Sequence, residues 1–162
     1  MTTHQGGCLC GALRFETTQD PVRVTVCHCA FCQRATGGAY MVEPIFDTSA
    51  FRITRGRPKT FDLVSEGSGK VVHVHFCPDC GTKLNLTFER FADVVGIYAG
   101  TFDDPDWFAI TPANARHIFL DEARPDTVIP AGLPTFARHA TSNAGETCVP
   151  TIYDSPHPIG HR

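Results

Sequence analysis

The sequence has no excess of basic residues, no long apolar run and no low-complexity segment. Its formal net charge is only −3, so it lacks the basic surface expected of a nucleic-acid-binding protein. No stretch approaches the roughly 18 consecutive apolar residues of a membrane-spanning helix, so we expect no membrane partner. The start, MTTHQGG, has no apolar core after a basic region and does not look like a secretory signal peptide. These absences predict a cytoplasmic protein.

Cysteine, by contrast, is abundant, with eight in a chain of 162 residues. That length is enough for one domain with a core of its own. In a secreted protein, an even number of cysteines would indicate a disulfide framework. Without an export signal, reduced and metal-bound thiolates are the favoured interpretation.

The apolar pattern predicts a mainly β fold of short antiparallel strands, arranged as a sandwich or an open barrel. Apolar and polar residues alternate in short runs that end at Gly, Pro, Asp or Ser. The predicted strands cover residues 12–18, 22–27, 39–46, 51–54, 60–64, 70–77, 82–88, 93–100 and 116–120. One short helix is predicted at Ala30–Thr36. We expect a domain over residues 1–136 and an irregular tail over 137–162, packed on the domain or on a partner chain. A homodimer is one option.

The first candidate site combines Cys8 and Cys10 with Cys77 and Cys80. Residues i and i+2 of a strand point to the same side, so Cys8 and Cys10 can converge. The segment CPDCG has the form of a zinc knuckle, in which the proline fixes the turn and Gly81 permits a tight backbone. The set predicts a structural, tetrahedral zinc site of four thiolates. Two disulfides, or a redox dithiol at the second pair, are the alternatives.

The second candidate site is the segment VCHCAFCQRATGG, which holds Cys27, Cys29 and Cys32. Three protein ligands with an open fourth position are typical of a catalytic zinc site. Such a site can accept one more anionic ligand, such as a thiolate, and therefore suits thiol chemistry. Strand alternation turns His28 away from its neighbours, so it is not predicted as a ligand. Three reduced thiols, two of which could form a disulfide, are the alternative.

Further side chains are candidates for roles around the second site. His73 and His75 share one face of their predicted strand and could move a proton, since histidine titrates near pH 6.5. Two exposed strand histidines are the alternative. Arg34 could hold a substrate carboxylate through a bidentate pair, or it could be a solvated side chain. His117 could lie under the site or in the core, and Cys148 is predicted to carry no metal.

The order of the motifs GGCLCGALRFE, VCHCAFCQRATGG, HFCPDCGTKL, GIYAGTFDDP, RHIFLDEARPD and GLPTF resembles the Gfa-like family. The resemblance runs from about Gly6 to Phe136. The family takes its name from glutathione-dependent formaldehyde-activating enzyme, and centromere protein V shares its domain. The resemblance implies a β-tent fold with a structural zinc on the first cysteine set and a catalytic-type zinc on the second. It also implies a carbon–sulfur lyase that, in reverse, joins glutathione and formaldehyde into S-hydroxymethylglutathione.

We therefore expect a zinc-dependent lyase or synthase acting on a small thiol–aldehyde adduct. Arg34 would anchor a carboxylate of the thiol, and His73 or His75 would move the proton. Holding the thiol and the aldehyde together would replace a bimolecular encounter. Two alternatives remain. One is a non-catalytic module that carries glutathione or its adducts, and the other is a structural zinc scaffold that binds a protein partner.

Overall fold

The computed structural model describes residues 3–161, which form two compact units. The first unit combines the chain up to Arg23 with Glu43–Ala109. The second unit combines Val24–Val42 with the chain from Ile110 onward. Each unit is therefore built from segments that are far apart in the sequence. Among the described residues, no helix is both long enough and apolar enough to cross a membrane.

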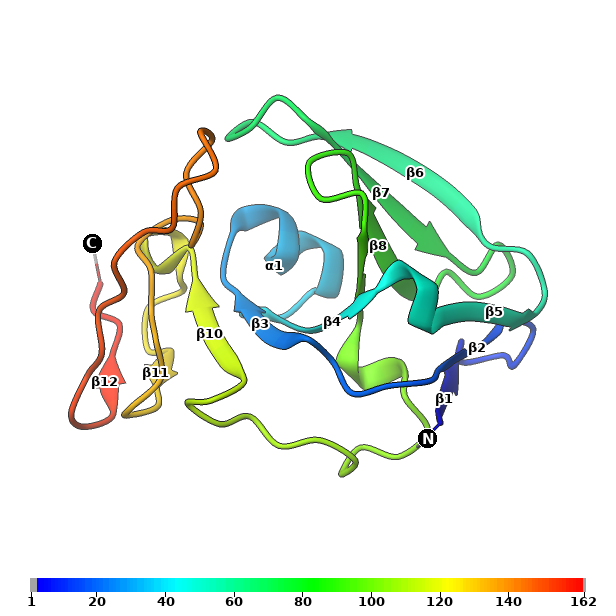
Figure 1. The fold of residues 1–162 in the computed structure, drawn as a ribbon, viewed down its shortest axis with the longest axis horizontal. Coiled ribbons are helices and arrows are strands. Elements are labelled where there is room, and N and C mark those ends of the chain that lie inside the picture. The colour runs from blue at the N-terminus through cyan, green and yellow to red at the C-terminus, as the bar shows by residue number, and fades with distance from the viewer. Residues whose placement is uncertain (1–2, 162) are drawn as a thin grey trace. The chain divides into compact units, whose positions relative to one another are not determined.

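The first unit contains two groups of antiparallel strands. The smaller is a three-stranded sheet in the order β1 (His4–Gly7), β2 (Arg14–Thr17) and β5 (Phe51–Arg55). The larger runs in the order β4 (Met41–Asp47), β9 (Val94–Ile97), β8 (Lys83–Phe88), β7 (Val71–Phe76) and β6 (Lys59–Val64), and Figure 1 shows β6, β7 and β8 side by side. Two single-turn 3₁₀ helices, η1 (Thr48–Ala50) and η2 (Ala99–Thr101), connect strands of this unit.

The core of the first unit is made of aliphatic and aromatic side chains from both groups of strands. Phe15, Phe46 and Leu84 are almost completely buried there. Cys8 and Cys77 belong to the same cluster. Burying one such apolar side chain contributes roughly 1.5–3 kcal/mol. Two cysteines of the first candidate site are thus fixed by the packing of the hydrophobic core itself.

The second unit is built around a parallel pair of strands. Strand β10 (Ala115–Ile118) pairs with β3 (Arg23–Cys27), with His117 opposite Val26 and Ile118 opposite Cys27. Helix α1 (Ala30–Thr36) follows β3, and the 3₁₀ helix η3 (Leu120–Glu122) follows β10. Strands β11 (Val128–Ile129) and β12 (His157–Pro158) form a small antiparallel sheet. The loop after β3 and the turn after β10 therefore start from the same end of the parallel pair.

The predicted mainly β fold is confirmed, and the predicted helix coincides with α1. The parallel pairing of β3 with β10 is an addition, because strand patterns carry no information about direction. The division into a domain ending at residue 136 and a tail stays a prediction. The chain after that residue contributes the bridge between Thr135 and Thr151 and the strand β12.

Candidate metal centres

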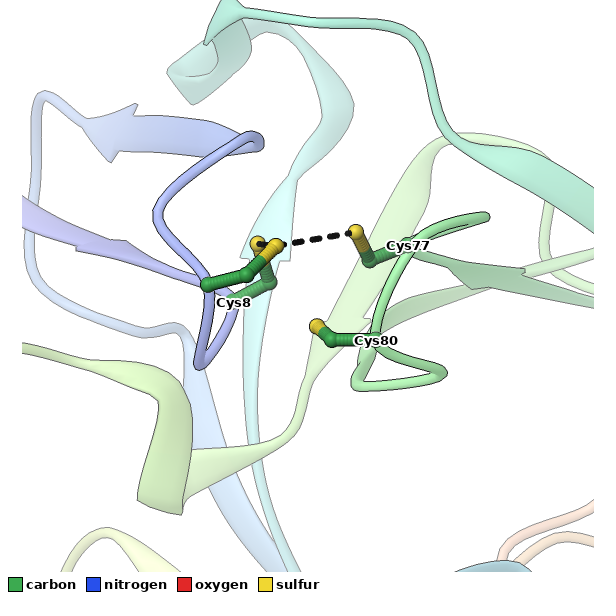
Figure 2. A group of neighbouring side chains, drawn as sticks. Cys8, Cys77 and Cys80 are labelled. Carbon is green, nitrogen blue, oxygen red and sulfur yellow. Dashed lines mark hydrogen bonds between the residues drawn. The ribbon is translucent and has the colours of Figure 1, made fainter.

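The four cysteines of the first set come together in the first unit. Their Sγ atoms all lie within 4.8 Å of one another. The Sγ atoms of Cys8 and Cys10 are 3.5 Å apart, and those of Cys10 and Cys77 are 3.7 Å apart. A tetrahedral zinc with Zn–S bonds of about 2.3 Å requires sulfur atoms about 3.8 Å apart. Figure 2 shows the side chains of Cys8, Cys77 and Cys80 directed toward one another. The cluster therefore fits one tetrahedral metal ion.

Two tight turns present these cysteines. Gly11, with φ of 75°, follows Cys10, and its N–H donates to the Cys8 carbonyl at 3.0 Å. Gly81, with φ of 74°, follows Cys80, and its N–H donates to the Cys77 carbonyl at 2.9 Å. Glycine adopts positive φ without the steric cost of a Cβ atom. Cys8 and Cys10 thus converge through a turn rather than through the strand alternation that the sequence suggested.

Hydrogen bonds to sulfur stabilise the thiolate forms of Cys8 and Cys80. The Leu13 N–H donates to Cys8 Sγ at 3.2 Å. The Thr82 hydroxyl lies 3.1 Å from Cys80 Sγ. The hydroxyl and then the backbone N–H of Thr82 lower the pKa of Cys80 to about 6. Metal ligands must be deprotonated, so these contacts prepare the site for a cation.

The three cysteines of the second set also converge, in the second unit. Cys27 ends β3, Cys29 is the N-cap of α1, and Cys32 lies in its first turn. The Sγ atoms of Cys27 and Cys29 are 3.4 Å apart, and all three sulfur atoms lie within 4.8 Å of one another. Cys27 and Cys32 are buried, whereas Cys29 is partly exposed. The cluster therefore offers three sulfur ligands to a metal ion.

The second cluster favours one thiolate, on Cys29. The Cys27 thiol donates to Cys29 Sγ, and the side chain and backbone N–H of Cys32 add to this, so the pKa of Cys29 falls to about 3. The pKa of Cys27 is raised, because its thiol keeps the proton that it donates in the hydrogen bond to Cys29. The pKa of Cys32 is raised as well, by its side-chain contacts with Cys27 and Cys29. A cation at this position would replace the two remaining protons.

His28 lies outside the cluster, as the alternation predicted. Its side chain is fully buried, and its Nε2 is 2.9 Å from Nδ1 of His117. Burial lowers the pKa of both imidazoles to about 4, so both are neutral at pH 7. His117, whose position the sequence left open, thus lies behind the segment that carries Cys27 and Cys29.

Glu122 is a contributor that sequence reasoning missed. Its carboxylate Oε2 accepts a hydrogen bond of 2.6 Å from the N–H of Ala30, between Cys29 and Cys32. Its backbone carbonyl accepts one of 2.9 Å from the Gln33 side chain. The same Gln33 Nε2 donates to the His28 carbonyl at 2.6 Å. No local signal marks Glu122, because the contact depends on the parallel pairing of β3 and β10.

The other predicted residues lie as follows. His73 and His75 are on β7, in the first unit. His73 Nδ1 is 2.7 Å from Asp62 Oδ1, and His75 lies between the hydroxyls of Thr60 and Thr87. Arg34 is exposed in the last turn of α1. The proton-transfer and carboxylate-binding roles of these residues stay predictions.

These observations define a class: a mainly β protein with two cysteine clusters that could each hold a metal ion. The sequence model of the family described as glutathione-dependent formaldehyde-activating enzyme matches residues 3–122. The chain belongs to this family.

A solved crystal structure of a Rhodobacter sphaeroides protein has a similar fold, with a TM-score of 0.51 and 19% sequence identity. The similarity covers 65% of this chain and 96% of that one. At this identity, it concerns the fold alone. No curated protein matches the sequence.

Proposed function

We propose that this protein is a zinc-dependent carbon–sulfur lyase, or a synthase in the reverse direction, for a small thiol–aldehyde adduct. The proposed adduct is S-hydroxymethylglutathione, formed from glutathione and formaldehyde. The observation that carries the proposal is the cluster of Cys27, Cys29 and Cys32, which offers three sulfur ligands on a chain of this family. Three ligands leave a fourth position for a substrate.

The reaction requires a bound sulfur and the movement of one proton. In the lyase direction, the adduct hydroxyl loses its proton, the carbon–oxygen bond becomes a carbonyl, and the carbon–sulfur bonding pair leaves with the sulfur. The synthase direction reverses these steps. A zinc ion on the second cluster would supply Lewis acidity and keep a sulfur deprotonated near neutral pH.

His73 is the better of the two proposed proton-transfer residues. Its Nδ1 faces the Asp62 carboxylate at 2.7 Å, which fixes the tautomer and leaves Nε2 able to accept a proton. Both ring nitrogens of His75 face threonine hydroxyls, at 3.1 and 2.9 Å. Burial, and then the neighbouring His73, lower the pKa of His75 and favour its neutral form.

Arg34 is the proposed anchor for the thiol substrate. It lies on α1, two residues after Cys32, and is exposed. A guanidinium group binds a carboxylate through two parallel hydrogen bonds, and glutathione carries two carboxylates. We place the protein in the cytoplasm, where the reducing environment keeps such cysteines as thiols.

The test is NMR exchange spectroscopy between formaldehyde hydrate and S-hydroxymethylglutathione, with the wild type and with Cys29→Ser. Faster exchange with the wild type alone supports the lyase. Binding of glutathione without any acceleration overturns catalysis and favours a module that carries thiols. An intact second site with no affinity for small thiols favours a scaffold for a protein partner.

A further inference from the structure

The segment after β10 makes a set of contacts with the cysteine-bearing loop that the proposed chemistry does not use. The His28 N–H donates to the Ile118 carbonyl at 3.0 Å, which extends the parallel pairing by one residue. The Glu122 carboxylate and carbonyl then contact Ala30 and Gln33. The loop is therefore held at three successive points from the same neighbouring segment.

A strained turn brings Glu122 to this position. Phe119 has φ of 62° and ψ of 44°, in the left-handed region that bulky residues rarely adopt. Its N–H donates to the Arg138 carbonyl at 3.0 Å, and the Leu120 N–H donates to the Phe136 carbonyl at 3.1 Å. The surrounding chain thus maintains an unfavourable backbone conformation, and the result is η3, with Glu122 directed at the loop.

The geometry points to Glu122 as a positioning residue of the three-cysteine site. Its carboxylate fixes the Ala30 N–H, which belongs to the peptide next to Cys29, and its carbonyl fixes Gln33, the residue after Cys32. Two of the three sulfur ligands are thereby held in place through their sequence neighbours. Removing a hydrogen-bonding residue that supports metal ligands in this way typically lowers metal affinity or activity by about 10- to 100-fold.

The positioning role of Glu122 rests on the proposed metal at the second cluster. The experiment must therefore distinguish failure of the positioning role from failure of the proposed function.

The decisive variants are Glu122→Ala, Glu122→Gln and the control Asp121→Ala. Asp121 is the adjacent acidic residue, and it faces Arg138 at 3.9 Å on the surface. Native mass spectrometry during a chelator titration of the purified protein counts the metal ions at both sites. We expect Glu122→Ala to weaken metal retention at the three-cysteine site about 10- to 100-fold and to leave the four-cysteine site unchanged. Glu122→Gln keeps an acceptor oxygen and should recover most of the affinity, and Asp121→Ala should match the wild type.

A second readout does not depend on metal. The Ala30 amide should exchange its hydrogen with solvent at least about 10-fold faster in Glu122→Ala than in the wild type or in Asp121→Ala, because the oxygen that accepts its hydrogen bond is lost. If Glu122→Ala does not fold, Gln33→Ala provides the comparison of metal retention with Asp121→Ala. Gln33→Ala removes the carbonyl contact and should weaken retention at the same site.

The outcomes distinguish the positioning role from the proposed function. A wild type that binds no second metal, with Ala30 protected only when Glu122 is present, overturns the metal-dependent function and leaves the contact itself intact. A wild type with two metals, together with equal retention and equal Ala30 exchange in Glu122→Ala, overturns the positioning role alone. Equal loss from both metal sites also overturns it, because the effect would then be general destabilisation.

Discussion

Nε2 of His28 and Nδ1 of His117 are 2.9 Å apart, and both imidazole side chains are buried in the second unit. Two neutral rings can share one N–H between these nitrogens. A protonated ring would be a buried positive charge. The hydrogen bond of the pair joins one imidazole to the other and not to a carboxylate, so it would not balance that charge. The pair therefore acts as a neutral link between the cysteine-bearing segment and β10, rather than as an acid or a base.

We predict that this pair makes the protein sensitive to acid. The pKa of each ring is about 4 in the folded chain, because of burial, against 6.5 for an ordinary histidine. Between these pH values the unfolded chain binds more protons, so the free energy of unfolding falls as the pH drops from about 6.5 to about 4. Above pH 6.5 both rings are neutral in the folded and in the unfolded chain, so their burial no longer lowers the free energy of unfolding. NMR titration of the two rings checks it directly, and midpoints near 6.5 would contradict the prediction.

Replacing one cysteine in each cluster should separate folding from function. We expect Cys77→Ser to give insoluble or unfolded protein, because Cys77 is fully buried in the core and belongs to the four-cysteine cluster. A structural zinc contributes roughly 10–16 kcal/mol in small zinc peptides, against a domain stability of about 5–15 kcal/mol. Cys29→Ser should give a folded protein with one metal ion. Circular dichroism measures whether each variant folds, and metal analysis counts its metal ions. Equal unfolding of both variants would refute the division into a structural and a functional site.

The two metal ions should leave at different rates when a chelator is added. The second cluster offers three sulfur ligands, one of them partly exposed, whereas the first offers four, two of which pack in the core. We expect the three-cysteine site to empty first while the fold persists. Native mass spectrometry with parallel circular dichroism follows both events. Simultaneous release with unfolding would show that the sites are not independent.

The first unit contains a glycine that cannot be replaced without cost. A Cβ atom at Gly96 would lie 1.8 Å from Oε1 of the buried Glu43 carboxylate. That side chain would have to move, and overpacking of this kind typically costs about 1–3 kcal/mol. Gly67 is the matched control, because a Cβ atom there meets nothing within 4 Å. Chemical denaturation of Gly96→Ala and Gly67→Ala should show a loss of stability in the first only.

Local patterns were sufficient for the strands β2 to β10, for α1 and for the composition of the two cysteine sets, but they missed the short strands β1, β11 and β12. The alternation rule also placed His28 correctly, away from the cluster. It was wrong at Cys8 and Cys10, which converge through a turn after β1.

What local patterns could not provide are the contacts between distant segments. His28 and His117 are 89 positions apart, and Ala30 and Glu122 are 92 apart. Both contacts depend on the parallel pairing of β3 with β10, and periodicity specifies a strand without specifying its partner. The role of Glu122 became visible only once that pairing was known.

The discontinuous course of the chain also sets an order for assembly on the ribosome. The four-cysteine cluster is complete in sequence once Cys80 has emerged, and its turns need nothing synthesised later than Thr82. The three-cysteine cluster emerges earlier, but the residues that brace it, His117 and Glu122, are made only afterwards. All ligands of the four-cysteine cluster are thus present before the residues that brace Cys27, Cys29 and Cys32, which stay unsupported until Glu122 has been made. That interval is when these thiols are most open to oxidation or to capture of the wrong metal.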